Sequence, residues 1–206
     1  NAAYWYDAGN KNQWITSSFY MEELPDWVKE FNSNNKADAY LNETWETLYD
    51  VETYTQSRAD NNIYENNLNG QEKPIFPKDL KKLREQNDNF SLIKTIPAGN
   101  TYTLDFIKAA IKGEQLGKSE FTDFLAVSFS STDYVGHRYG IASIETEDTY
   151  LRLDKDLGHF FNFLDTEVGK ENYTLFLTAD HAAVHVPSYL QSLKIPAHYL
   201  STKKLK

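Results

Sequence analysis

Two apolar stretches of the 206-residue sequence decide the predicted fold: Phe124-Leu125-Ala126-Val127-Ser128-Phe129 and Tyr173-Thr174-Leu175-Phe176-Leu177-Thr178. Near-continuous apolar runs of this length are typical of strands that are buried on both faces of a parallel sheet. Between them, Ser143 can cap a long helix in which apolar residues recur at steps of three and four from Leu153 to Val168. Strand, helix and strand in this order predict a βαβ unit whose parallel strands end at the same sheet edge.

The sequence on either side of this unit predicts an accessory region followed by an α/β core. Residues 101–206 form part of the core, with a further helix over 101–116 before the first strand. Residues 1–100 form the accessory region: an aromatic-rich hairpin (3–6 with 14–20), short helices near 27–31 and 37–49, and a long polar loop over 50–79. The predicted fold class is therefore α/β, a part of a parallel sheet with flanking helices plus this hairpin and helix region.

Composition and charge exclude several classes of protein. Hydrophobic residues make up 40% of the chain and aromatic residues 15%, enough for a packed core. The 21 Lys+Arg against 30 Asp+Glu leave a net charge of −9, which disfavours binding to nucleic acid or to an anionic membrane. Cysteine is absent, so disulfides and thiolate metal sites are excluded and any metal must bind through oxygen and imidazole ligands.

The start of the sequence reads like the interior of a larger protein. It opens directly on the strand-like Ala2-Ala3-Tyr4-Trp5-Tyr6, and its only methionine is Met21. Neither a basic-then-apolar leader nor an apolar run of about 18 residues, as a membrane span needs, is present. We therefore expect a piece of a longer polypeptide, without a membrane span in this piece.

Carboxylate and imidazole side chains follow both predicted strands directly. Asp133 and His137 come after the first strand, four residues apart, so one helical turn would place them on the same side. Asp180 and His181 come directly after the second strand. Since both strands end at one edge, we expect the four side chains to gather there, and two Asp with two His form a ligand set suited to zinc.

Other interpretations of these residues remain open. Taken alone, Asp133 can form an Asx-turn with His137 at the surface, and Asp180 can be a helix N-cap. The remaining histidines have no comparable partners and are expected to be structural or exposed: His159, His185 and His198. Four of the aromatic residues in the predicted hairpin are Tyr4, Trp5, Tyr6 and Trp14. We expect them to pack in the core, and the alternative is that they line a carbohydrate or nucleotide site.

The sequence resembles the alkaline phosphatase superfamily, and most closely its bacterial phosphate-irrepressible branch with a threonine nucleophile. The resemblance is carried by residues 130–137 (Ser-Ser-Thr-Asp-Tyr-Val-Gly-His), by residues 143–154 and by Thr178-Ala179-Asp180-His181. The opening hairpin is also similar to that branch. The Asp-x-x-x-His and Asp-His motifs are shared by type I phosphodiesterases and nucleotide pyrophosphatases, so they indicate the superfamily more strongly than the branch.

The resemblance implies a site with two Zn²⁺, in which Asp133 and His137 serve one ion while Asp180 and His181 serve the other. It also implies hydrolysis of a small phosphate monoester through a covalent phospho-threonine, in a protein exported to the bacterial periplasm. The family's threonine nucleophile and phosphate-binding residues have no matching motif here, so no catalytic residue and no substrate-binding residue is assigned, and this segment alone is expected to be inactive.

Two other functions stay open for the sequence. One is a phosphodiesterase or nucleotide pyrophosphatase of the same superfamily. The other is a noncatalytic exported module that binds glycan through the hairpin aromatics.

Overall fold

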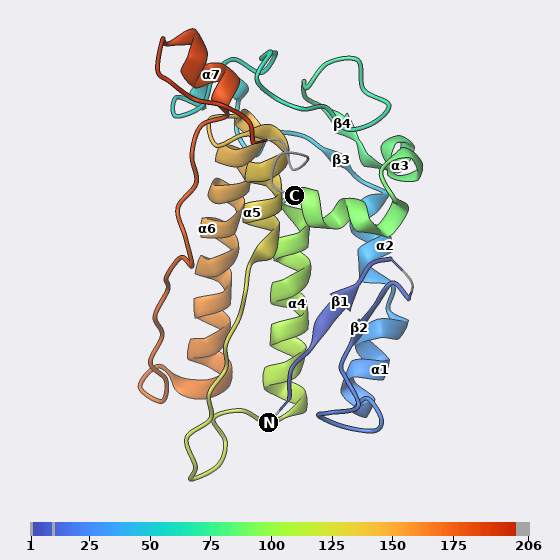
Figure 1. Cartoon of the computed structure of the whole chain (residues 1–206). Coiled ribbons are helices and arrows are strands. Elements are labelled where there is room, and N and C mark those ends of the chain that lie inside the picture. The colour runs from blue at the N-terminus through green and yellow to red at the C-terminus, as the bar shows by residue number, and fades with distance from the viewer. Residues whose placement is uncertain (1, 10, 201–206) are drawn as a thin grey trace.

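The computed structural model describes residues 2–9 and 11–200, and helices dominate it (Figure 1). Within these ranges, no helix is both long and apolar enough to span a membrane. The strands are β1 (Trp5–Asp7), β2 (Gln13–Ile15), β3 (Thr44–Trp45) and β4 (Lys78–Asp79). The helices are α1 (Asp26–Ser33), α2 (Lys36–Leu41), η1 (Val51–Thr53), α3 (Leu80–Leu83), η2 (Arg84–Gln86), η3 (Asn89–Thr95), α4 (Ala98–Gly113), α5 (Ser130–Tyr139), α6 (Ile144–Leu164), the π-helical turn η4 (Asp165–Gly169) and α7 (Pro187–Ser192).

Two long helices, α4 and α6, stand side by side, and α5 packs against both near their upper ends in Figure 1. Leu104, Ile107 and Ile111 of α4 bury their side chains against Phe160 and Leu164 of α6. The predicted helix over 101–116 is therefore confirmed, shifted by about one turn. A second hydrophobic cluster runs from Trp14 to Tyr139, and the division of the chain at residue 100 stays a prediction.

The predicted aromatic hairpin is confirmed over its central residues. β1 and β2 pair antiparallel, with Tyr6 opposite Trp14. The Trp14 ring stacks on Phe106 of α4, with 4.0 Å between the ring centroids. Asn32 of α1 accepts a hydrogen bond from the Trp14 backbone amide and donates one to the Trp14 carbonyl oxygen. Trp14 is therefore a core residue, as the first of the two interpretations of these aromatics expects.

The predicted helix over 37–49 is wrong beyond residue 41. The Asn42 side chain bonds to the carbonyl oxygen and the carboxylate of Asp38, which closes the end of α2. The chain then enters β3, which pairs antiparallel with β4. The Trp45 indole donates to the Asp148 carboxylate of α6 at 2.8 Å, and this distant partner favours the extended conformation.

The predicted cap of the long helix is confirmed. Ser143 has an extended backbone, and its Oγ accepts a hydrogen bond from the Thr146 backbone amide at 3.1 Å. This bond satisfies one of the amides that the first turn of a helix leaves unpaired. The helix runs on to Leu164, and Gly169 adopts a left-handed φ of 104° at the end of the π-helical turn.

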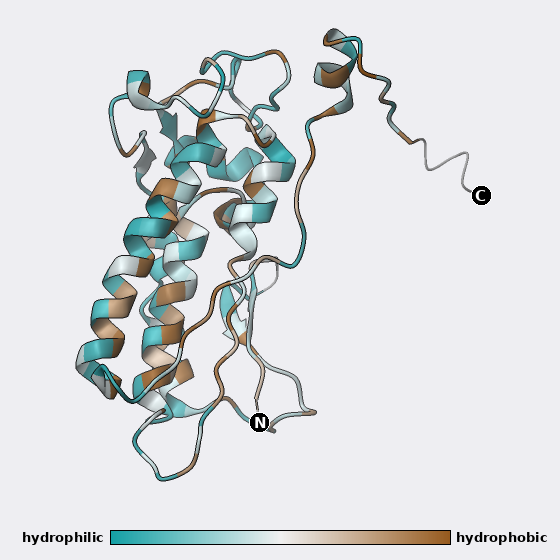
Figure 2. Cartoon of the chain, turned by 90° about the vertical axis from the view of Figure 1, so that its left-hand side faces the viewer, coloured by the Kyte–Doolittle hydropathy of each residue, from teal (hydrophilic) through white to brown (hydrophobic). Residues whose placement is uncertain are grey.

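The two segments predicted as buried strands are extended but unpaired and exposed. Phe124 is 80% exposed and Phe176 75%, and hydrophobic residues in brown stand on extended chain outside the helices in Figure 2. Among the described residues, the strands pair only as β1 with β2 and β3 with β4. A lone strand is not stable, because its backbone groups and both faces need neighbours, and this portion of the chain supplies none to these segments.

The order and direction of the predicted βαβ unit are nevertheless present. Figure 1 shows residues 122–129 and 173–179 both climbing from the lower end of α6 toward α5 and α7. The two segments therefore finish at the same end of the molecule, where the candidate metal ligands lie.

Candidate metal centre

Helix α5 places the first candidate pair. It begins at Ser130, directly after the first extended segment, so Asp133 lies in its first turn and His137 one turn later. His137 Nε2 is 3.4 Å from Asp133 Oδ1. The carboxylate and the imidazole thus share one side of the helix, as the spacing of four predicts.

The second pair approaches the first across more than forty residues of sequence. His181 Nε2 is 3.7 Å from Asp133 Oδ1 and 3.7 Å from Asp180 Oδ2. Asp133 therefore lies between two imidazoles, one from α5 and one from the end of the second extended segment. The structure brings together the four residues that the sequence analysis singled out.

The distances and the donor atoms suit zinc. Two ligand atoms on one tetrahedral zinc, each about 2.0 Å from the ion, are about 3.3 Å apart, close to the separation of His137 Nε2 and Asp133 Oδ1. His181 Nδ1 lies 3.0 Å from the Ala182 carbonyl oxygen, to which it donates when it carries the proton, leaving the Nε2 lone pair free. The ligands that this chain supplies are thus compatible with zinc.

The four side chains do not form a closed centre by themselves. Across residues 2–9 and 11–200, no group of three or more His, Asp or Glu is arranged to hold an ion. Asp180 is 91% exposed and His137 76%. The hydrogen bond to Ala182 and the nearby Asp180 and Asp133 carboxylates raise the pKa of His181, so a proton competes with metal for this imidazole.

Close packing fixes α5 on α4. A Cβ added to Gly99 would lie 2.0 Å from Ser131 Oγ, so glycine permits this approach of the two helices. Asn100 donates to Thr132 Oγ1 at 3.0 Å, one residue before Asp133. This close contact and this hydrogen bond hold the first turn of α5, which carries Asp133, against the first turn of α4.

A buried carboxylate that no sequence motif indicated, Asp148, holds three segments together. Asp148 of α6 accepts hydrogen bonds from Trp45 Nε1 at 2.8 Å and Arg152 Nε at 2.6 Å through Oδ2, and from the Leu48 amide at 2.7 Å and the Tyr54 hydroxyl at 2.5 Å through Oδ1. Burial and this bond to Asp148 raise the pKa of Tyr54 to about 12. The only local signal was the i,i+4 spacing of Asp148 and Arg152.

A buried ion pair lies next to this carboxylate. Lys78 Nζ is 2.8 Å from Glu145 Oε1, and both side chains are fully buried. At this distance the two groups form a direct ion pair. The Lys78 ammonium also faces the rings of Phe76 at 4.8 Å and Tyr139 at 5.3 Å.

Two further carboxylates share these surroundings. Burial, with smaller effects from Glu145 and Asp60, raises the pKa of Glu65 to about 8. Neither carboxylate oxygen of Glu65 has a hydrogen-bond partner within the protein. Desolvation also raises the pKa of Asp60 and Glu145, so one buried cation, Lys78, compensates several carboxylates that are costly to ionise.

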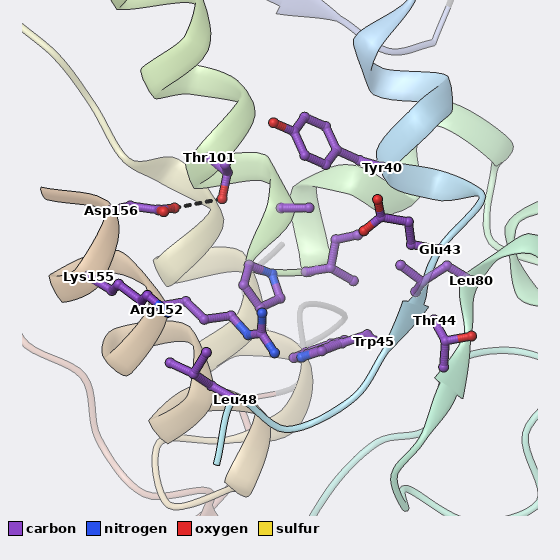
Figure 3. A pocket seen from close by; sticks show the side chains of 13 residues that line it. Tyr40, Glu43, Thr44, Trp45, Leu48, Leu80, Thr101, Arg152, Lys155 and Asp156 are labelled. Atoms are coloured by element: carbon purple, nitrogen blue, oxygen red, sulfur yellow. Dashed lines mark hydrogen bonds between the residues drawn. The ribbon is translucent and has the colours of Figure 1, made fainter. Parts of the chain in front are cut away.

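A surface hollow of about 290 Å³ lies apart from the candidate ligands (Figure 3). Its lining includes Tyr40, Trp45, Arg152 and Asp156, and the Thr101 hydroxyl donates to Asp156 at 2.7 Å across one side. None of the four candidate ligands lines it. His159 and His198 are exposed, while His185 is half-buried beside Tyr189.

The sequence matches the family of type I phosphodiesterases and nucleotide pyrophosphatases over residues 2–205. The chain belongs to this family. It is 52% identical over 203 residues to alkaline phosphatase PhoV of Synechococcus elongatus, covering 98% of this chain and 36% of that protein. It is 47% identical over 198 residues to alkaline phosphatase PafA of Elizabethkingia meningoseptica, covering 96% of this chain and 36% of that protein.

A protein of Myroides odoratus named calcium-transporting ATPase is 52% identical over 208 residues, covering 100% of this chain and 38% of that protein. The crystal structure of wild-type alkaline phosphatase PafA matches this fold with a TM-score of 0.92 at 46% identity, covering 98% of this chain and 39% of that one. The predicted superfamily and the α/β fold class are confirmed. The chain spans between 36% and 39% of the length of these relatives.

Proposed function

We propose that the chain is a segment of a zinc-dependent alkaline phosphatase that hydrolyses small phosphate monoesters. The observation that carries this proposal is the approach of His137 and His181 to the Asp133 carboxylate, at the end where both extended segments finish. Similarity to proteins named alkaline phosphatase supports the same reaction class. Export to the periplasm belongs to this proposal, since the family resemblance implies it.

The roles of the residues follow from their atoms. Asp133 and His137 would hold one zinc, and Asp180 and His181 the other, with His181 Nε2 presented by the bond of Nδ1 to Ala182. Bound zinc supplies Lewis-acid stabilisation of the transferring phosphoryl oxygens. The threonine nucleophile and the phosphate-binding side chains would come from other parts of the longer protein, and so would the sheet neighbours of residues 122–129 and 173–179.

The phosphodiesterase alternative remains a second candidate, because the family over residues 2–205 is described by that activity. The glycan-binding alternative has less support, since Trp14 is buried and Tyr6 packs against the same core. In the longer protein, the ratio of aryl phosphate monoester to diester hydrolysis separates the two enzyme activities.

We expect the 206-residue chain to bind zinc weakly, because each ion keeps only two protein ligands where catalytic zinc has three. Asp133→Ala and His181→Ala should each reduce zinc affinity by at least about tenfold, since loss of even an outer-shell partner costs 10–100-fold. Calorimetric titration measures this, with His159→Ala on exposed α6 surface as the matched control. If neither Asp133→Ala nor His181→Ala changes the zinc affinity, these residues are not the zinc ligands and the metal assignment is wrong.

We also expect no turnover of an aryl phosphate monoester by this chain alone, even with excess zinc. A positioned nucleophile and charge stabilisation supply most of the rate of phosphoryl transfer, and both are assigned to parts outside this chain. Phosphate release is measured for the chain and its His181→Ala variant in parallel, and for the longer protein with and without Asp133→Asn. Turnover by the chain that disappears in His181→Ala would show that a nucleophile lies within these residues.

A further inference from the structure

The polar loop over 50–79 is anchored on the first turns of α6. The backbone N–H of Gln56 donates to the Glu147 carboxylate at 3.2 Å, and the backbone N–H of Arg58 donates to the Ala142 carbonyl oxygen at 2.8 Å. Ala142 lies in the turn between α5 and α6. The backbone of Arg58 is therefore fixed beside the end of the helix that carries Asp133.

The side chain of Arg58 extends from this anchor to α7. Its guanidinium carbon is 3.4 Å from the centroid of the Tyr189 ring, and Nη2 is 3.5 Å from His185 Nδ1. Tyr64 meets the Tyr189 ring edge-on at 5.4 Å. Figure 1 shows the cyan part of the loop beside α7. A planar guanidinium stacked on a half-buried tyrosine makes a cation–π contact that lysine reproduces poorly.

The segment after His181 has few other attachments. Within the described residues, the backbone hydrogen bonds of α7 and its following turn stay between residues 186 and 195, such as that from the Leu190 amide to the Val186 carbonyl oxygen. Val186 also lies near Gly140, where an added Cβ would be 4.0 Å from Val186 Cγ1. Arg58 thus provides a polar link from the α5–α6 turn to this segment.

We propose that Arg58 is a positioning residue for the candidate metal centre. By holding His185 and Tyr189, it keeps Asp180 and His181, which lie a few residues earlier on the same segment, beside Asp133. A centre whose ligands assemble in only a fraction of molecules binds metal more weakly by that fraction. This inference rests on the proposed function, because it assigns Arg58 to the same metal site.

Two measurements test the proposal. Hydrogen exchange of the Tyr189 and Leu190 backbone amides, measured without metal, reports how firmly α7 is attached. Titration with Co²⁺ reports the metal affinity of the site, and the visible spectrum of the bound ion reports its ligand geometry. Arg58→Ala and Tyr189→Leu should accelerate this exchange by roughly 2- to 30-fold, the range that a cation–π contact corresponds to. Both should raise the Kd for Co²⁺ several-fold and alter its spectrum.

Matched variants separate positioning from general loss of structure. Tyr189→Phe keeps the ring and should retain wild-type exchange and Co²⁺ affinity, and Arg58→Lys should fall between wild type and Arg58→Ala. Lys29→Ala removes an exposed cation from α1, on the opposite side of the molecule in Figure 1, and should change neither.

The outcomes distinguish this inference from the proposed function. Faster exchange with unchanged Co²⁺ affinity, or unchanged exchange in Arg58→Ala, would overturn the positioning role. A wild-type chain that binds no Co²⁺ would instead overturn the metal assignment, and the exchange comparison would still decide whether Arg58 holds α7.

Discussion

Replacing Asp148 with alanine is expected to lower the free energy of unfolding by about 3–5 kcal/mol, the cost of removing one partner from a buried charge network. Asp148 accepts four hydrogen bonds, and its side chain is fully buried. Its loss leaves the Trp45 indole, the Leu48 amide and the Tyr54 hydroxyl without an acceptor where little water can replace it. The loop that contains Arg58 should loosen in the same variant.

Urea denaturation followed by tryptophan fluorescence measures this loss. Asp148→Asn tests the charge at constant volume, and because its amide nitrogen cannot accept a hydrogen bond, it should recover only part of the stability. Asp154→Ala, at an exposed position on the same helix, is the matched control and should stay within about 0.5 kcal/mol of wild type. An Asp148→Ala variant as stable as this control would contradict the anchoring role.

Local patterns predicted the helices that are stabilised by their own sequence. The Ser143 cap and the apolar spacing after Leu153 predicted α6 with a start within one residue. The acidic residues of its first turns are of the type that lies exposed and interacts favourably with the helix dipole. Two of them, Glu145 and Asp148, are buried instead, because their partners lie far away in sequence and no local pattern encodes that distance.

The candidate site could be predicted further than the sheet around it. The spacing of Asp133 and His137 predicts their contact on α5, and the common direction of the two extended segments explains the approach of His181. The apolar runs around Phe124 and Phe176 predicted buried strands, but both side chains are exposed. The burial of a strand depends on neighbouring strands and helices, and the described residues do not include these neighbours. The role of Arg58 had no sequence signal, since a stacked arginine depends on the fold of the polar loop.

Lys78 offers the second large effect, because it is a fully buried cation among carboxylates. Glu145 is its direct partner at 2.8 Å, and Glu65 and Asp60 lie within its electrostatic influence. Burial already raises the pKa of Glu145 against the opposing effect of this lysine. Without the lysine, ionised Glu145 would remain in a desolvated environment with no compensating charge.

We therefore expect Lys78→Met to lose about 3–5 kcal/mol of unfolding free energy near pH 8, as when one partner of a buried pair is removed. The Lys78→Met/Glu145→Leu variant should recover most of this loss, because a well-packed apolar pair of similar volume needs no charge compensation. The single variant should also become more stable as the pH falls. Its Glu145 has a folded-state pKa raised further above the unfolded value, so protonated Glu145 is favoured at low pH and stability is lost as the pH rises through the folded-state pKa.

Urea denaturation of the wild type, the single variant and the double variant between pH 5 and pH 9 tests both statements. The difference in unfolding free energy between the single and double variants should be largest at high pH and should shrink toward pH 5. Glu65, whose pKa is raised to about 8 in part by Glu145, is present in all three proteins, so this difference reports Glu145 together with its repulsion of Glu65. A single variant that matches the double variant at pH 9, or a difference that is constant with pH, would show that Lys78 does not stabilise an ionised Glu145. The lysine would then hold the polar loop through the ring faces of Phe76, Tyr139 and Trp45.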